Sequence, residues 1–400
     1  MKLGIDVLLN DRGLADRLKN KRLALLGHPA SMTGDFVHSL DGLMQQGIRV
    51  SATFGPQHGM CGDKQDNMVE SEDSVDAVYG IPVFSLYGKT RRLTSAMLDC
   101  FDLLLVDLQD IGCRIYTFLS TLFYGMEDCA AANKGLWVLD RPNPAGRPIE
   151  GARLVPGYES FVGVAPIPMR HGLTFGEAAR WYCQRYGLDL DLTVVPMQDY
   201  CPERPPGFGW PVDEIPWVNP SPNIATLNAA RVYAGSVLLE GTTISEGRGT
   251  TRALEIAGAP DIDSRRILNS MRESIPDLFQ ACKIRPCCFE PTFHKHSGKL
   301  CQGFQIHTDY PAYRAAHFKP YRIIAMFLKT LRNISPDYPI WRDFPYEYVT
   351  DRLAIDVIDG SENLRHWIDD PESAYPDLDS RLVADESSWL EESRGFWLYS

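Results

Sequence analysis

The sequence has no apolar stretch long enough to cross a membrane. A transmembrane helix needs about 18 or more consecutive apolar residues, and no such run occurs in the 400 residues. The short apolar run at the start is soon interrupted by Asp11 and Arg12, which does not fit a signal peptide. We therefore expect the chain as given to be cytoplasmic and to have no membrane partner.

Positive charge is also scarce. The chain has 40 Lys and Arg residues against 52 Asp and Glu residues, which gives a formal net charge of −12. Nucleic acids and anionic membranes bind basic faces, so neither is expected as a partner. A local arginine cluster would still allow an anionic small molecule to bind.

The cysteine and glycine motifs of common cofactor sites are missing. None of the ten cysteines forms a Cys-x-x-Cys pair or stands at zinc-finger spacing from a histidine, so we expect free thiols and no metal site. No Gly-x-Gly-x-x-Gly motif follows the first predicted strand, and no P-loop occurs. The absence of both motifs argues against a nucleotide-dependent enzyme.

The composition is that of an ordinary globular protein. Apolar residues make up 44% and aromatic residues 10% of the chain, which excludes a largely disordered protein. At about 150 residues per domain, the length predicts two domains. The first half contains short runs that are apolar throughout, as strands buried on both faces are. These runs lie at residues 22–27, 49–54, 81–85, 103–107 and 136–140.

Helical patterns separate several of these predicted strands. Residues 37–46 form one such stretch, and residues 115–130 carry apolar side chains at helical spacing. Thr174 and Glu177 fit a capping box at the start of another helix. Strands that alternate with helices predict an α/β fold with a Rossmann-like, doubly wound, mostly parallel sheet.

The composition of the sequence changes from Cys201 onward, where prolines follow one another closely. Such a segment cannot be a regular helix or a central strand, so we place a domain boundary near it. We predict a Rossmann-like N-terminal domain at residues 1–225, a smaller C-terminal domain of the α+β kind at residues 226–400, and a cleft between them. The elements expected in the second domain are helices at 264–274 and 313–331 and strands near 283–290 and 302–308.

Ligands of doubly wound sheets bind beyond the carboxyl ends of the strands. Four successive predicted strands end in polar loops shaped by glycine and proline, which predicts a polar cleft at this edge. The candidate residues in these loops are Gln57, His58, Tyr87, Gln109, Asp110, Arg114, Asp140 and Arg141. The loop from Asp107 to Arg114 is either a ligand-orienting set or a helix cap with a structural ion pair.

A second cluster of candidate residues lies at 240–252. It contains Glu240, Glu246, Arg248 and Arg252 among glycine, serine and threonine. Two arginines beside exposed amides suit the capture of a carboxylate or phosphate, although a surface turn with solvated charge has the same pattern. Two further candidates in loops, Asn223 and His171, complete the set; a lone loop histidine can equally be structural.

Eight motifs in this chain together resemble a known family. They are Gly55-Pro-x-His-Gly59, Ser85-Leu-Tyr-Gly88, Asp107-x-Gln-Asp-x-Gly-x-Arg-x-Tyr-Thr117, Leu139-Asp-Arg-Pro-Asn-Pro144, Arg170-His-Gly172, Pro220-Ser-Pro-Asn223, Ser245-Glu-Gly-Arg-Gly-Thr-Thr-Arg252 and Trp341-Arg-x-x-Pro-Tyr-Glu-Tyr348. In this order they are similar to the NamZ-type exo-β-N-acetylmuramidases. The resemblance implies a Rossmann-like domain, a smaller second domain and an active cleft between them. It also implies cofactor-free release of N-acetylmuramic acid from the non-reducing end of peptidoglycan fragments, as in cell wall recycling.

One position departs from the family pattern. The family usually has a glutamate before the histidine of the first motif, a candidate catalytic carboxylate, whereas this chain has Gln57. A glutamine side chain cannot donate or take a proton at neutral pH. Either another carboxylate takes the acid role, or the chain is a weakened or non-catalytic homologue that binds muropeptides or amino sugars.

Our hypothesis assigns the proton donor to Glu246 and keeps Glu240 as the reserve candidate. Asp110 would stabilise developing positive charge or orient the N-acetyl group, and Arg248 and Arg114 would bind the lactyl carboxylate. The residues expected to position sugar hydroxyls are Gln57, His58, Tyr87 and Asn223. The expected partner is a small muropeptide or amino sugar.

Overall fold

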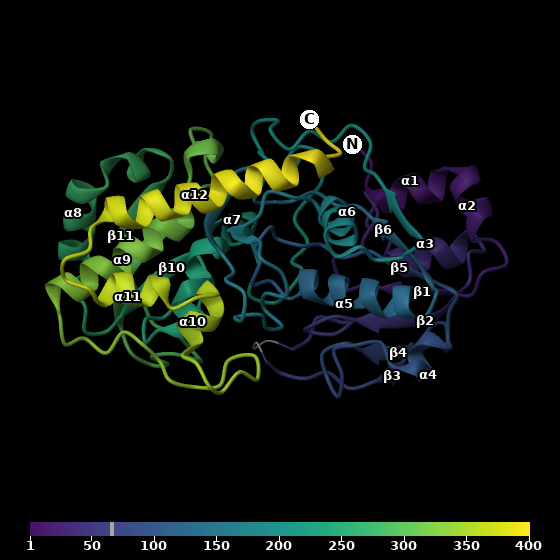
Figure 1. Cartoon of the computed structure of the whole chain (residues 1–400), viewed down its shortest axis with the longest axis horizontal. Coiled ribbons are helices and arrows are strands. Elements are labelled where there is room, and N and C mark those ends of the chain that lie inside the picture. The colour runs from purple at the N-terminus through teal and green to yellow at the C-terminus, as the bar shows by residue number, and fades with distance from the viewer. Residues whose placement is uncertain (65–67) are drawn as a thin grey trace.

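A computed structural model of the chain describes residues 1–64 and 68–400. Its helices and strands gather in two bodies that lie side by side, one from the first half of the chain and one from the second (Figure 1). The N-terminus and the C-terminus lie close together at the first body.

The first body is built on a seven-stranded sheet. Its strands are β1 (Leu23–Leu26), β2 (Val50–Gly55), β3 (Ser74–Val75), β4 (Pro82–Ser85), β5 (Leu103–Val106), β6 (Gly135–Leu139) and β9 (Leu192–Val195). The order is β3-β4-β2-β1-β5-β6-β9, and all neighbours are parallel except β3 and β4. If β3 is left out and the other six strands are renumbered by their order in the chain, their order across the sheet is 3-2-1-4-5-6. This is the order of the Rossmann fold, which confirms the predicted fold class.

Helices cover both faces of this sheet, which explains why its strands are apolar throughout. Leu23 and Leu25 of β1 belong to the core under one face, and Ala24 and Leu26 belong to the core under the other. The first core includes side chains of α1 (Gly4–Asn10), α2 (Arg12–Leu18) and α3 (Ser39–Gln45). The second includes side chains of α4 (Ser95–Leu98), α5 (Phe118–Ala131) and α6 (Phe175–Tyr186).

Local signals set where several helices begin. The capping box of α6 is confirmed: the Thr174 hydroxyl accepts from the Glu177 backbone N–H at 3.3 Å, and the Glu177 carboxylate accepts from the Thr174 N–H at 2.9 Å. The expected helix start near residue 313 was wrong. That helix, α9 (Pro320–Ile334), starts at a proline, whose missing N–H costs nothing in the first turn.

The second body combines a three-stranded antiparallel sheet with helices. The sheet order is β10-β12-β11. The helices and strands of the second body are α7 (Leu227–Ser236), η1 (Val237–Gly241), β10 (Ile256–Ala259), α8 (Ser264–Ser274), η2 (Pro276–Gln280), β11 (Lys283–Phe289), β12 (Cys301–His307), η3 (Ala315–His317), α9, α10 (Ala354–Asp359) and α11 (Asn363–Asp369). Our proposed boundary, between residues 225 and 226, immediately precedes α7.

Two further pieces join the bodies. The sequence did not predict the antiparallel pair β7 (Glu150–Arg153) and β8 (Pro168–Arg170). Helix α12 (Tyr375–Ser393) packs on this pair and runs along both bodies before η4 (Arg394–Phe396) and the C-terminus (Figure 1). One continuous apolar core therefore extends from α5 and α6 through α7 and α9 to α12.

The cysteine prediction is confirmed, since all ten are free thiols. Within residues 1–64 and 68–400, no helix has both the length and the apolar character that a membrane span requires.

Candidate active site

A narrow cavity of about 30 Å³ lies between loops of the two bodies. The first body contributes the loop after β2 and the segment before α5, and the second contributes η1, the turn after it and the segment before α10. The lining residues are Gln57, His58, Ile115, Tyr116, Thr117, Val162, Ser221, Asn223, Ile224, Tyr233, Glu240, Arg248, Leu254, Tyr346 and Glu347.

Glu347 reaches this cavity from a tight hairpin. The Tyr346 and Val349 backbones exchange hydrogen bonds, and the two residues between them, Glu347 and Tyr348, have φ angles of 46° and 67°. The Tyr87 hydroxyl donates to both carboxylate oxygens of Glu347 at 3.0 Å. Burial, together with the charge of Glu240, raises the pKa of Glu347 to about 7 although Tyr87 and Arg91 favour its charged form.

Gln57 also contacts this carboxylate. Its side-chain oxygen accepts a hydrogen bond from the Thr117 hydroxyl at 2.8 Å. Its amide nitrogen is therefore the group that donates to Glu347, and this hydrogen bond favours the charged carboxylate. The residue that departs from the family pattern thus serves as a neutral donor to an acid that lies beside it.

Glu240 is the second carboxylate of the lining. Arg248 Nη2 lies 2.7 Å from its Oε1, and the Tyr346 hydroxyl donates to its Oε2 at 2.8 Å. Both oxygens are therefore held by donors, one of them cationic, and Glu240 is only 4% exposed. Such an arrangement fixes the position of both carboxylate oxygens.

Glu246 lies behind Arg248 and is not among the residues that line the cavity. Its carboxylate is fully buried between Lys295 Nζ at 2.7 Å, Arg248 Nε at 3.2 Å and His294 Nδ1 at 3.3 Å. Burial opposes its ionisation, but these cationic groups outweigh burial and lower the pKa of Glu246 to about 2. Because it has no proton to give near neutral pH, the geometry does not favour Glu246 as the acid.

The turn that carries Glu246 and Arg248 requires glycine. Gly247 has a φ of 79°, and a Cβ atom there would lie 2.4 Å from the Ile256 side chain. This glycine therefore has a conformational role, in addition to any close approach of a ligand.

Asp110, Gln109 and His171 lie together but outside the lining. Asp110 accepts from the Gly112 backbone N–H at 2.7 Å and lies 3.5 Å from His171 Nε2. The Gln109 amide donates to the carbonyls of Asp110 and Pro142. These contacts shape the loop after β5, just behind Tyr116.

Four other candidates have structural partners away from the cavity. Arg114 donates to four backbone carbonyls, two of them at the end of α10, and Arg141 pairs with Asp107. Asp140 accepts from Gly176 at the start of α6, and Arg252 pairs with Glu255 at 3.3 Å. In the loop after β5, neither Asp107 nor Asp110 pairs with Arg114, and no side chain of the loop caps α5, so the predicted helix cap with an ion pair is not formed there.

The sequence did not lead us to Glu347 or Lys295. Glu347 was present in the quoted motif at residues 341–348, and its position beside a Pro-Tyr pair was the available signal. Lys295 lies in a loop before β12 that we had not singled out. His58 and Asn223 do line the cavity, as expected of binding residues.

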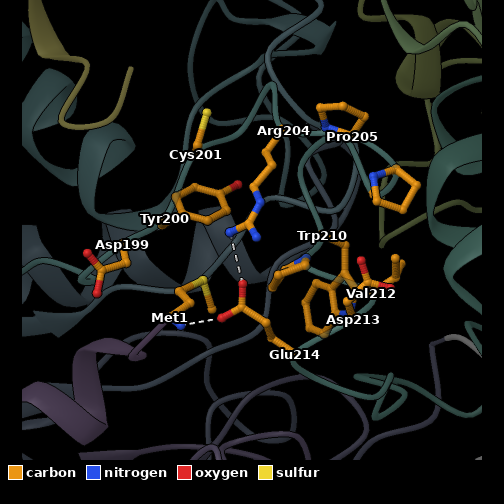
Figure 2. Close-up of a pocket in the computed structure, with 13 residues that line it drawn as sticks. Met1, Asp199, Tyr200, Cys201, Arg204, Pro205, Trp210, Val212, Asp213 and Glu214 are labelled. Atoms are coloured by element: carbon orange, nitrogen blue, oxygen red, sulfur yellow. Dashed lines mark hydrogen bonds and ion pairs between the residues drawn. The ribbon is translucent and has the colours of Figure 1, made fainter.

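A second hollow lies in the proline-dense segment and has a different character. Three of its charged groups pair with one another: Glu214 accepts from the Met1 amino group and pairs with Arg204 at 3.1 Å (Figure 2). Its other walls are aromatic and proline side chains. It brings together no arrangement of acid and base groups comparable to that around Glu240 and Glu347.

The chain matches known proteins over almost its whole length. Family models described as the N-terminal and C-terminal parts of exo-beta-N-acetylmuramidase NamZ match residues 23–228 and 231–399. The peptidoglycan beta-N-acetylmuramidase NamZ of Bacillus subtilis (strain 168) is 41% identical over 345 residues, which cover 84% of this chain and 78% of that protein.

Crystal structures of two DUF1343 family proteins from Bacteroides fragilis NCTC 9343 have similar folds. Their TM-scores are 0.85 and 0.77 at 28% and 25% identity, and each match covers 100% of this chain and 99% of the other. With the family models and the Bacillus relative, these similarities identify the chain as a member of the NamZ exo-β-N-acetylmuramidase family.

Proposed function

We propose that this chain is a glycosidase that releases N-acetylmuramic acid from the non-reducing end of peptidoglycan fragments. Family membership supports the reaction, and one observation supports the site: two buried carboxylates, Glu240 and Glu347, face one cavity between the two bodies. Glycoside hydrolysis uses such a pair, one to protonate the leaving oxygen and one to act on the oxocarbenium-like transition state.

Glu347 is the proposed proton donor. A general acid works best when its pKa is near the operating pH, and the pKa of Glu347 is raised to about 7. Near neutral pH its carboxyl group is therefore protonated in a large share of molecules. This assignment replaces Glu246, whose surroundings keep it charged.

Glu240 is the proposed charged partner. Arg248 and Tyr346 hold its two oxygens, so that its negative charge remains fixed while positive charge develops on the sugar. Asp110, to which we first gave this role, is not among the residues that line the cavity.

Arg248 is also the proposed contact for the lactyl carboxylate. It is the one Lys or Arg side chain among the described residues that line the cavity. Arg114 donates to four backbone carbonyls and is not among the residues that line the cavity. His58 and Asn223 are proposed to position hydroxyl or acetamido groups. Recycling of small fragments in the cytoplasm remains a prediction from the sequence.

The test compares two leaving groups in a Glu347→Gln variant. The disaccharide N-acetylmuramyl-β-1,4-N-acetylglucosamine has a basic leaving oxygen that needs a proton, whereas 4-nitrophenyl N-acetyl-β-muramide does not. We expect kcat/KM to fall by about 10²–10⁴-fold on the disaccharide and far less on the nitrophenyl substrate.

Glu150→Gln is the matched control, because Glu150 is a fully buried carboxylate outside the cavity that accepts from the backbone of α9. It should lower stability and leave the ratio of the two rates unchanged. Equal losses on both substrates in Glu347→Gln would argue against the acid role. No hydrolysis of either substrate by the unmodified chain would instead favour a binding protein.

A further inference from the structure

Four charged side chains of alternating sign lead from the cavity into the second body. Their order is Glu240, Arg248, Glu246 and Lys295, and we call them the charge chain. The successive closest contacts are 2.7 Å, 3.2 Å and 2.7 Å. All four side chains are at least nine-tenths buried, yet only Glu240 and Arg248 line the cavity.

Lys295 also holds the backbone that carries Glu240. Its ammonium group donates hydrogen bonds at 2.6, 3.0 and 2.8 Å to three carbonyls, those of Leu239, Thr242 and Ile244. Leu239 directly precedes Glu240 in η1, and the other two residues form the turn that follows. One buried cation therefore fixes both the backbone of this segment and the far end of the charge chain.

The alternation of positive and negative charge stabilises the charge chain, because each buried charge lies next to a charge of opposite sign. A buried carboxylate without a partner is costly, so Glu246 stays in place only because cations flank it. Glu246 in turn holds the Nε side of the Arg248 guanidinium, while the other side binds Glu240. If Lys295 lost its charge, Glu246 would compete with Glu240 for Arg248.

We infer that Lys295 is a positioning residue for the glycosidase reaction, which holds the carboxylate of Glu240 in place through Glu246 and Arg248. This inference rests on the proposed function, because it concerns the charged partner of that reaction. It adds a residue that touches no substrate and lies two side chains away from the cavity.

Other groups that face the charge chain come from several elements. Glu240 faces Arg248, Tyr346, Tyr233 and Glu347. Glu246 faces Lys295, Arg248 and His294, and Arg342 acts electrostatically on Lys295. The expected shifts of the pH profile assume that these surrounding groups keep their positions and charges in the variants.

The test uses two substitutions that change the charge in opposite directions. Lys295→Met removes a positive charge from the buried surroundings of the site, and we expect the acidic limb of the pH profile of kcat/KM to move to higher pH. Glu246→Gln removes a negative charge and moves that limb to lower pH. Each shift should be about 0.5–1 pH unit, and the double variant should return close to the unmodified protein. The substrate is 4-nitrophenyl N-acetyl-β-muramide.

Lys329→Met is the matched control. Lys329 is likewise a buried lysine of the second body, and it donates to the carbonyls of Trp367, Ile368 and Asp370. Its loss should lower the melting temperature and leave the acidic limb in place. A purely structural role for Lys295 would give the same result as this control.

Unchanged limbs in Lys295→Met and Glu246→Gln, or shifts in the same direction, would overturn the inference. If Lys295→Met does not fold, Glu246→Gln decides alone: a shift to lower pH supports the inference, and an unmoved limb overturns it. Lack of muramide hydrolysis by the unmodified chain would overturn the proposed function itself. An active Lys295→Met protein with an unmoved limb would overturn only the role of Lys295.

Discussion

At the scale of single residues, the site depends on which carboxylates are surrounded by cations. Glu246 and Glu347 are both buried, yet the pKa of the first is lowered to about 2 and that of the second is raised to about 7. Lys295, Arg248 and His294 surround Glu246, whereas Glu347 is hydrogen-bonded by neutral groups and lies near another carboxylate. The same type of side chain is therefore a fixed charge at one position and the proposed proton donor at the other.

The raised pKa of Glu347 predicts a definite pH dependence. On the disaccharide, kcat/KM should fall as the pH rises through about 7, because the acid form is lost. The contribution of Glu347 to stability is fully present below its unfolded value of 4.5 and is lost as the pH rises through about 7. Urea unfolding from acidic to alkaline pH should therefore show Glu347→Gln gaining stability relative to the unmodified chain. If the free energies of unfolding of Glu347→Gln and the unmodified chain differed by the same amount at every pH, this assignment would be contradicted.

Gln57→Glu should convert the Gln57–Glu347 contact into a pair of carboxyl groups. Two adjacent carboxyl groups share a proton and titrate as a pair, so the alkaline limb should move up by about 1 pH unit and activity on the disaccharide should increase. Gln109→Glu, outside the lining, is the control. An unmoved limb would show that residue 57 and Glu347 do not act together.

At the scale of elements, the site is built from the ends of secondary structure and from one strained turn. The loop after β2 carries Gln57 and His58 into the cavity, as expected at the carboxyl edge of a parallel sheet. The hairpin at Glu347 and Tyr348 has two consecutive positive φ angles. This geometry normally selects Asn-Gly, so a Glu-Tyr pair there stores strain at a functional position.

Glu347→Asn should relieve part of this strain and abolish proton donation. Asparagine tolerates the left-handed region well, and at alkaline pH the variant also avoids the cost of a buried charge. We expect it to be more stable than the unmodified chain by about 1 kcal/mol at pH 8, with little activity on the disaccharide. A lower urea midpoint in the variant would contradict the strain account.

At the scale of the whole molecule, the cavity depends on two bodies held together by the end of the chain. Helix α12 passes along both, and the residues after it return to the first body (Figure 1). The Tyr399 hydroxyl donates to Asp140 at 2.6 Å and accepts from the Met197 backbone N–H at 3.0 Å. Burial raises the pKa of Asp140 to about 6, and the bond from Tyr399 opposes this rise.

Tyr399→Phe should therefore destabilise the protein without changing the chemistry. Asp140 and the Met197 N–H would each lose a buried partner, which costs about 1–3 kcal/mol. We expect a lower urea midpoint and an unchanged kcat/KM for the folded fraction. Tyr186→Phe, at a half-exposed tyrosine of α6, is the control and should leave the midpoint in place.

The sequence by itself determined the fold class, the capping box of α6 and the family, because apolar periodicity, capping residues and motif order are local properties of a chain. It also indicated Gln57, His58, Asn223, Glu240 and Arg248, which lie in the cavity. Only the tertiary structure decided which carboxylates face that cavity. The surroundings of Glu246 and Glu347 come from loops distant in sequence, and burial and neighbouring charge set the protonation of a carboxyl group more strongly than its place in a motif.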